Sequence, residues 1–85
     1  MLEKKIVVQL EYGLHARPAA AFVKRASSFS SDIQLLKKEK AINGKSIMGV
    51  MAAAIGKGEE VTLVADGADE AEAIAELEKL LLEEE

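Results

Sequence analysis

The sequence predicts an α+β sandwich, in which helices cover one face of a β-sheet. Alternating hydrophobic residues mark short strands, and apolar residues spaced three and four apart mark helices between and after them. The resulting order is β-α-β-β-α-β-α. No linker, repeat or low-complexity segment divides the 85 residues. We therefore expect residues 1–85 to form a single domain.

The N-terminal part predicts a strand followed by a helix. In KKIVVQL, residues 4–10, Ile6, Val8 and Leu10 alternate with Val7 and Gln9, so the first three should share one face of the strand and point into the core. Pro18 is tolerated only in a first helical turn, so the helix should begin within about two residues of His15. Its apolar face follows the i, i+3, i+4, i+7 pattern and comprises Ala19, Phe22, Val23 and Ala26.

The remaining elements follow from the same reasoning. DIQLL and KAIN should be strands joined by a lysine-rich turn, and residues 46–53 should form a short helix. A strand follows in EEVTLVADG, with Val61, Leu63 and Ala65 facing one way. The last helix should start at a capping box formed by Asp69 and Glu72. Its expected buried face comprises Ala71, Ile74, Leu77 and Leu81.

Composition narrows the class of protein. The chain has no cysteine, so it has neither a disulfide framework nor a thiolate metal site. It contains no apolar run of the roughly 20 residues that a membrane span needs, and its N-terminal apolar segment is too short for a signal peptide, so we expect a cytoplasmic protein without membrane insertion. The first 45 residues carry nine Lys/Arg and four Asp/Glu, whereas the last 40 carry two and eleven.

The basic N-terminal half raises the alternative of a small nucleic-acid-binding module. Against this alternative, the net charge is -4 and the chain has one Tyr, two Phe and no Trp on which bases could stack. We therefore expect no nucleic-acid partner.

The segment GLHARPAA contains the only histidine and the only proline of the chain. A helix that starts near Ala16 leaves the first-turn N–H groups, including those of Ala16 and Arg17, free to bind an anion. The positive helix end favours a neutral imidazole at His15, whose free lone pair can attack phosphorus. The guanidinium of Arg17 can hydrogen-bond phosphate oxygens. These residues together predict a site for a covalently held phosphoryl group.

Two competing chemistries fit less well. A metal site would need several carboxylates to converge on one histidine beside a repelling arginine, so we expect neither metal nor cofactor. A hydrolase triad would need a serine and an orienting acid at the histidine, and no sequence feature places them there. A third possibility is that His15 only caps the helix, a position at which Ser, Thr, Asp or Asn are preferred.

GLHARPAA, followed by NGKSIMGVM and the ending GKGEEVTLVADGADEAEA, resembles the HPr family, the histidine-containing phosphocarrier proteins of the bacterial sugar phosphotransferase system. The resemblance covers essentially the whole chain. It implies an open-faced sandwich with a four-stranded antiparallel sheet and three helices on one face. It also implies that His15 accepts a phosphoryl group from enzyme I at Nδ1 and passes it to the A components of sugar transporters, with Arg17 assisting.

The resemblance further implies a carrier rather than a stand-alone enzyme, and we expect a monomer. Tyr12 departs from the family, because many relatives have a small polar residue there that could hydrogen-bond the phosphate. A carrier of a nitrogen-regulatory branch, or a mainly regulatory paralogue, remains an alternative within the family. The presence of His15 argues against a relative that lacks the carrier step.

Ser46 is a second candidate site. A serine before an apolar segment is by default a helix N-cap. A phosphate at a helix N-terminus is also electrostatically favourable, so capping and phosphorylation are compatible. The surrounding IMGVM resembles relatives from Gram-positive bacteria, which implies regulation through HPr kinase/phosphorylase and a catabolite-control regulator.

A docking face is expected on the two helices that follow these sites. Arg17, Ala20 and Lys24 fall on a face of the first helix distinct from its core residues. On the short helix, Val50 is expected in the core. Its neighbours Ile47, Met48 and Met51 are candidates for a partly exposed surface, and methionine suits a surface that serves several partners.

Overall fold

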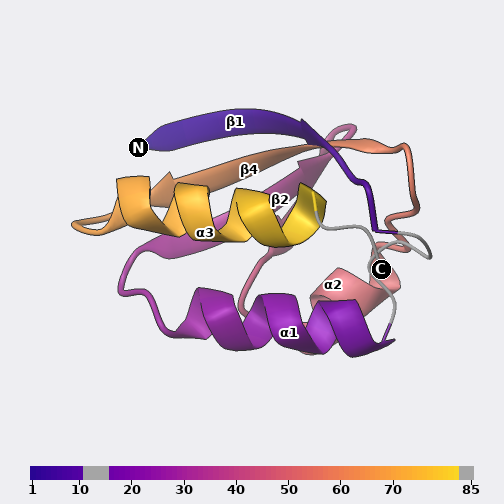
Figure 1. Ribbon diagram of the computed structural model, residues 1–85, viewed down its shortest axis with the longest axis horizontal. Coiled ribbons are helices and arrows are strands. Elements are labelled where there is room, and N and C mark those ends of the chain that lie inside the picture. Colours follow the sequence, from indigo (N-terminus) through magenta and orange to yellow (C-terminus); the bar gives the residue numbers. More distant parts are fainter. Residues whose placement is uncertain (11–15, 83–85) are drawn as a thin grey trace.

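A computed structural model describes residues 1–10 and 16–82, and Figure 1 shows the path of the chain. The elements are β1 (Leu2–Val7), α1 (Ala16–Ser27), β2 (Asp32–Lys37), β3 (Lys40–Asn43), α2 (Ile47–Ala52), β4 (Glu60–Asp66) and α3 (Glu70–Leu82). The predicted order of strands and helices is therefore confirmed.

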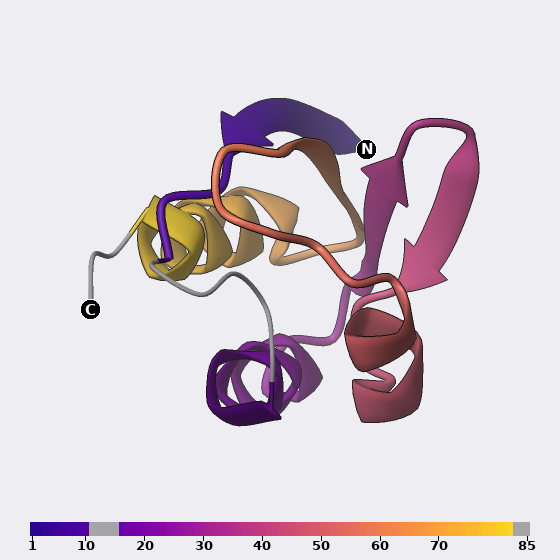
Figure 2. The same cartoon turned by 90° about the vertical axis from the view of Figure 1, so that its right-hand side faces the viewer.

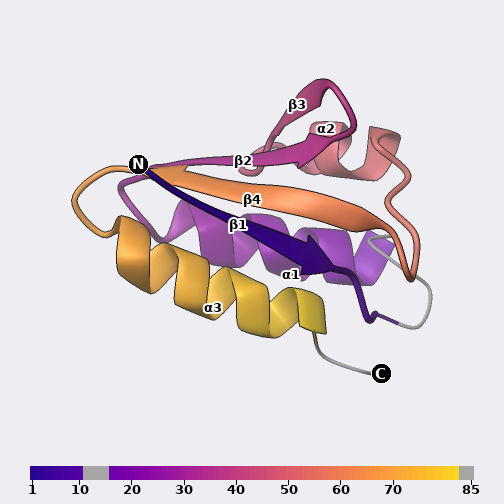
Figure 3. The ribbon, with the colours of Figure 1, turned by 90° about the horizontal axis from the view of Figure 1, so that it is seen from above.

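The four strands form one antiparallel sheet with the order β1-β4-β2-β3. Seen from above, β4 lies between β1 and β2, and α1 and α3 run beneath the sheet (Figure 3). The end-on view places all three helices on the same side of the sheet (Figure 2). The expected open-faced sandwich is confirmed.

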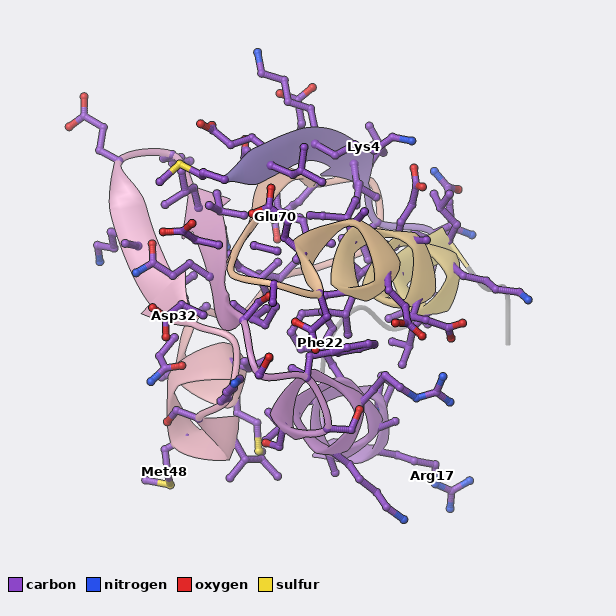
Figure 4. All side chains as sticks on the ribbon, turned by 90° about the vertical axis from the view of Figure 1, so that its left-hand side faces the viewer. Lys4, Arg17, Phe22, Asp32, Met48 and Glu70 are labelled. Atoms are coloured by element: carbon purple, nitrogen blue, oxygen red, sulfur yellow. The ribbon has the colours of Figure 1, made fainter. Side chains whose placement is uncertain are left out.

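The core lies between this sheet and the helices. Strand residues at every second position face the helices, so that Leu35 of β2 pairs with Leu63 of β4 and both are fully buried. Among the described residues, Phe22 is the largest fully buried side chain, and it enters the core from α1 (Figure 4). The predicted inward-facing residues Ile6, Val8 and Leu10 are also buried.

The first strand ends earlier than predicted. Beyond Val7 the chain leaves the sheet edge, because the backbone of residues 8 and 9 bonds to loop and helix groups instead of strand β4. The Val8 N–H donates to Glu59 O at 3.0 Å, its carbonyl accepts from Gly58 N at 2.8 Å, and the Gln9 N–H donates to Leu81 O at 3.0 Å. These bonds fix the chain as it approaches the segment before α1.

Two expectations for α3 were wrong. Ala71 is exposed, and Ala73 occupies the buried face with Ile74, Leu77 and Leu81. The Asp69 carboxylate does not complete a capping box with Glu72. It instead accepts hydrogen bonds from Ser30 N at 2.9 Å and Ser31 N at 3.0 Å, and from the hydroxyl of the fully buried Ser31.

The Ser31 hydroxyl and then the Ser30 amide lower the pKa of Asp69 to about 2. This carboxylate therefore joins the loop before β2 to the start of α3. No local sequence pattern indicates this contact, because the two partners are 38 residues apart.

Candidate functional site

Helix α1 begins at Ala16, as the proline predicted. Pro18 is buried in the first turn, where a missing N–H leaves no hydrogen bond unmade. His15 and Tyr12 lie outside the described residues. The role expected of His15 therefore stays a prediction, and so does the effect expected of Tyr12.

The first turn of α1 is electrostatically open to an anion. It contains no acidic residue, whereas Lys24 and Arg25 lie in the last turn, next to the negative end of the helix dipole. Arg17 is exposed, and no carboxylate of residues 1–10 or 16–82 lies within ion-pair distance of it. The positive helix end and the guanidinium of Arg17 thus both attract an anion to the first turn of α1.

Ser46 is the N-cap of α2, as expected. Its backbone is extended (φ -112°, ψ 112°), and its hydroxyl oxygen accepts from Gly49 N at 3.2 Å. The side chain is half-buried. The hydroxyl therefore lies at the start of a helix, where a phosphate would meet further backbone N–H groups.

The turn that delivers Ser46 is held by side-chain and backbone contacts. The side-chain Oδ1 of Asn43 accepts from Lys45 N at 2.9 Å, and the backbone carbonyl of Asn43 accepts from Ser46 N at 3.1 Å. The ammonium of Lys45 donates to Phe29 O at 2.8 Å, which ties the turn to the loop after α1. At Gly44 a Cβ would lie 2.7 Å from Cγ2 of Ile33, so the close approach to β2 requires glycine.

Helices α1 and α2 lie next to each other on the side of the molecule away from the sheet (Figure 2). Arg17 and Met48, one on each helix, extend away from the sheet (Figure 4). Met48 is 78% exposed, Ile47 41% and Met51 44%, whereas Val50 is fully buried. Ala20 and Lys24 are exposed on α1. Every described residue expected on the docking face is therefore accessible. Within α2, Val50 belongs to the core, and Ile47, Met48 and Met51 belong to the surface.

One polar cluster was not anticipated. At the end of β2 the Lys37 ammonium donates to Ala53 O at 2.9 Å and to Ala54 O at 3.1 Å, and it forms an ion pair with Glu59 at 3.1 Å. The backbone N–H of Gly56, and after it Lys37, lower the pKa of Glu59. A run such as KKEK offers no sequence signal that one lysine is engaged and the others are not.

An open groove lies beside this cluster, between the β2–β3 turn and α2, and its walls include Lys38, Lys40, Ile42, Gly49 and Ala52. It is separate from the first turn of α1. In the part of the chain that the structure describes, no group of three or more His, Cys, Asp or Glu residues gathers as metal ligands. Within the same residues, every helix is too short or too polar to span a lipid bilayer.

Comparison with known proteins is consistent with this geometry. The family model for the phosphorylation site of the HPr component of the phosphotransferase system matches residues 2–83. The HPr-like protein Crh of Bacillus subtilis is 50% identical over 84 residues, which covers 99% of this chain and 99% of Crh.

Solved structures agree with the sequence match. HPr-C-His from Thermoanaerobacter tengcongensis superimposes with a TM-score of 0.92 at 49% identity, covering 95% of this chain and 91% of that one. A crystal structure of Crh from Bacillus subtilis, described as an intertwined dimer with a swapped domain, has a TM-score of 0.80 at 49% identity and covers 100% of this chain and 98% of that one.

The family match over residues 2–83, the sequence identity and the shared fold lead to one conclusion: this chain belongs to the HPr family of phosphocarrier proteins.

Proposed function

We propose that this protein carries a phosphoryl group on His15, accepting it from enzyme I and passing it to the A components of sugar transporters. The observation that carries the proposal is the start of α1 at Ala16, directly after the histidine, in a chain of the HPr family. The absence of acidic side chains from that first turn adds support, because a carboxylate there would repel a phosphoryl group.

The transfer is an in-line displacement at phosphorus. The lone pair of the neutral imidazole forms the new nitrogen–phosphorus bond as the bond to phosphorylated enzyme I breaks, and the donor group keeps that electron pair. Arg17 and the backbone N–H groups of Ala16 and Arg17 stabilise the charge on the transferred oxygens. The A component then attacks the same phosphorus, so the protein is restored unchanged and acts as a carrier.

The exposed side chains of α1 and α2 form the docking surface in this proposal, with Ala20 and Lys24 on one helix and Ile47, Met48 and Met51 on the other. An apolar centre beside basic residues suits partners with acidic surfaces. Phosphorylation of Ser46 by HPr kinase/phosphorylase would add charge next to this surface and so alter partner choice, including that of a catabolite-control regulator. The carrier would work in the cytoplasm as a monomer, although the Crh relative is described as a dimer.

Incubation with enzyme I and phosphoenolpyruvate, followed by phosphorus NMR, tests the carrier role. We expect one acid-labile phosphate per chain, and none in His15→Ala. Arg17→Ala should slow transfer at least about tenfold, the factor that corresponds to about 1.4 kcal/mol.

Arg25→Ala is the matched control, because it removes the same charge from the last turn of the same helix. Acid-labile label in His15→Ala would overturn the assignment of His15. Equal slowing in the two arginine variants would exclude a local role for Arg17.

A mainly regulatory HPr-like protein is the second candidate, since Crh is 50% identical and its structure is described as that of a catabolite repression protein. Such a protein would take phosphate on Ser46 from an ATP-dependent kinase and none from enzyme I. The same NMR experiment separates the two, because phosphoserine survives acid and phosphohistidine does not. A nucleic-acid-binding module would instead show binding that falls steeply with salt.

A further inference from the structure

Helix α2 depends on its ends for its position. It has six residues, and helices this short have little stability of their own in water. Val50 is its only buried side chain. Contacts at its two termini therefore contribute to fixing the orientation of its exposed residues.

The N-terminus is held by Ser46 and the C-terminus by Lys37. Lys37 lies at the end of β2, and its ammonium donates to the carbonyls of Ala53 and Ala54 at 2.9 and 3.1 Å. Carbonyls at the end of a helix have no partner within the helix, and a cation there also complements the helix dipole. No basic residue of α2 itself occupies its last turn, so the cation comes from the neighbouring strand.

Glu59 holds the ammonium in this place. One carboxylate oxygen lies 3.1 Å from Lys37 Nζ, and the other accepts from the backbone N–H of Gly56. The Lys37 side chain is 20% exposed, whereas Lys38 and Lys40 are exposed residues of the same hairpin. The cluster thus joins the end of β2, the end of α2 and the loop that leads to β4.

The backbone at this end of the helix is strained. Ala54 has φ +52°, a left-handed conformation that residues other than glycine rarely adopt. Glycine is the residue usually found there after a helix. The hydrogen bond from Lys37 to the Ala54 carbonyl helps to keep this conformation.

From this geometry we infer that Lys37 is a positioning residue: it fixes the C-terminal end of α2 and thereby the docking side chains Met48 and Met51. The link to docking rests on the proposed function. The positioning itself depends only on the contacts described above, so the two parts can be tested separately.

Amide hydrogen exchange followed by NMR tests the positioning. The informative amides are those of Ala53 and Ala54, which donate to Gly49 O and Met51 O at 3.1 Å each. Lys37→Met keeps the alkyl chain and removes the charge, and we expect it to speed exchange of these amides at least about fivefold relative to the core strand amide of Leu63. Lys37→Arg should restore slow exchange.

Lys40→Met is the matched control, because Lys40 faces Lys37 in the strand register and carries the same charge. Its exchange should match that of the unmodified protein. Unchanged exchange in Lys37→Met, or an equal increase in Lys40→Met, would overturn the assignment of Lys37.

Steady-state phosphoryl transfer from enzyme I then tests the link to docking. Lys37→Met should raise KM for the carrier about threefold or more with kcat unchanged, whereas Lys40→Met should change KM less. An unchanged KM despite faster exchange would overturn the link. If the unmodified protein accepts no phosphoryl group, the carrier proposal fails with its docking link, and the exchange result still decides the positioning.

Discussion

Substitutions of Val50 and Met48 should have separate effects, one on the stability of the fold and the other on partner binding, although both residues belong to one short helix. They lie two positions apart on α2, yet Val50 is fully buried and Met48 is 78% exposed. Val50→Ala should therefore destabilise the fold with little direct effect on a partner contact. Met48→Ala should do the opposite, because it removes surface that only a partner would cover.

The magnitude for Val50→Ala follows from burial. The substitution removes two buried carbon groups at about 0.8 kcal/mol each, and the residual cavity raises the total to about 2 kcal/mol. A chain of 85 residues has an unfolding entropy near 0.18 kcal/mol/K, so Tm should fall by about 11 °C. Met48→Ala should change Tm by less than about 2 °C and weaken partner binding about fivefold, or about 1 kcal/mol.

Differential scanning calorimetry gives Tm, and titration of enzyme I monitored calorimetrically gives Kd, both measured on each variant. Val50→Ala should be compared with the unmodified protein well below its Tm, so that all chains are folded. A Met48→Ala protein that binds as tightly as the unmodified one would remove Met48 from the docking surface. A Tm loss of under about 3 °C in Val50→Ala would refute the stability contribution worked out here from the burial of this side chain.

Three further predictions concern the polar contacts. The pKa of Asp69 is about 2 in the folded protein against an ordinary 3.8, so its contribution to stability is present above pH 4 and is lost as the pH falls from about 4 to 2. Urea unfolding over this pH range should show a loss of stability that Asp69→Asn abolishes. Equal losses of stability with falling pH in the two proteins would contradict this prediction. Ala54→Gly should raise Tm by a few degrees, since glycine accepts the left-handed conformation at φ +52° without strain, and a lower Tm would be contrary to this reasoning. Ser46→Ala removes the hydroxyl that accepts from Gly49 N, and it should lower the free energy of unfolding, measured by chemical denaturation, by about 1 kcal/mol. Ser27→Ala, at an exposed position, is the control. Equal losses in the two variants would exclude a stabilising role for the Ser46 cap.

The sequence was sufficient for features that depend on local chemistry. Pro18 located the start of α1, and alternation located the inward faces of the strands, because both signals act over a few residues. The resemblance to the HPr family supplied what periodicity could not, namely the antiparallel arrangement of the four strands. The expectation for Ala71 failed because neighbouring alanines leave the apolar stripe of α3 ambiguous by about half a turn.

Contacts between distant segments could not be inferred. Asp69 was assigned to its own helix start, yet its carboxylate binds a loop 38 residues away. Lys37 is one of three lysines in KKEK, and only its position at the end of β2 aims it at α2. Side chains of this kind are selected by tertiary geometry, which the types and spacing of residues do not specify.

The position of β4 between β1 and β2 also bears on how the protein is made. Both of those strands need β4 as a partner, and β4 is the last strand to leave the ribosome. During synthesis, the β2–β3 hairpin can pair early, while β1 waits without its neighbour until about residue 66 has emerged. Completion of the sheet is therefore a late step that waits for β4, and crowding among nascent chains would be most harmful during that interval.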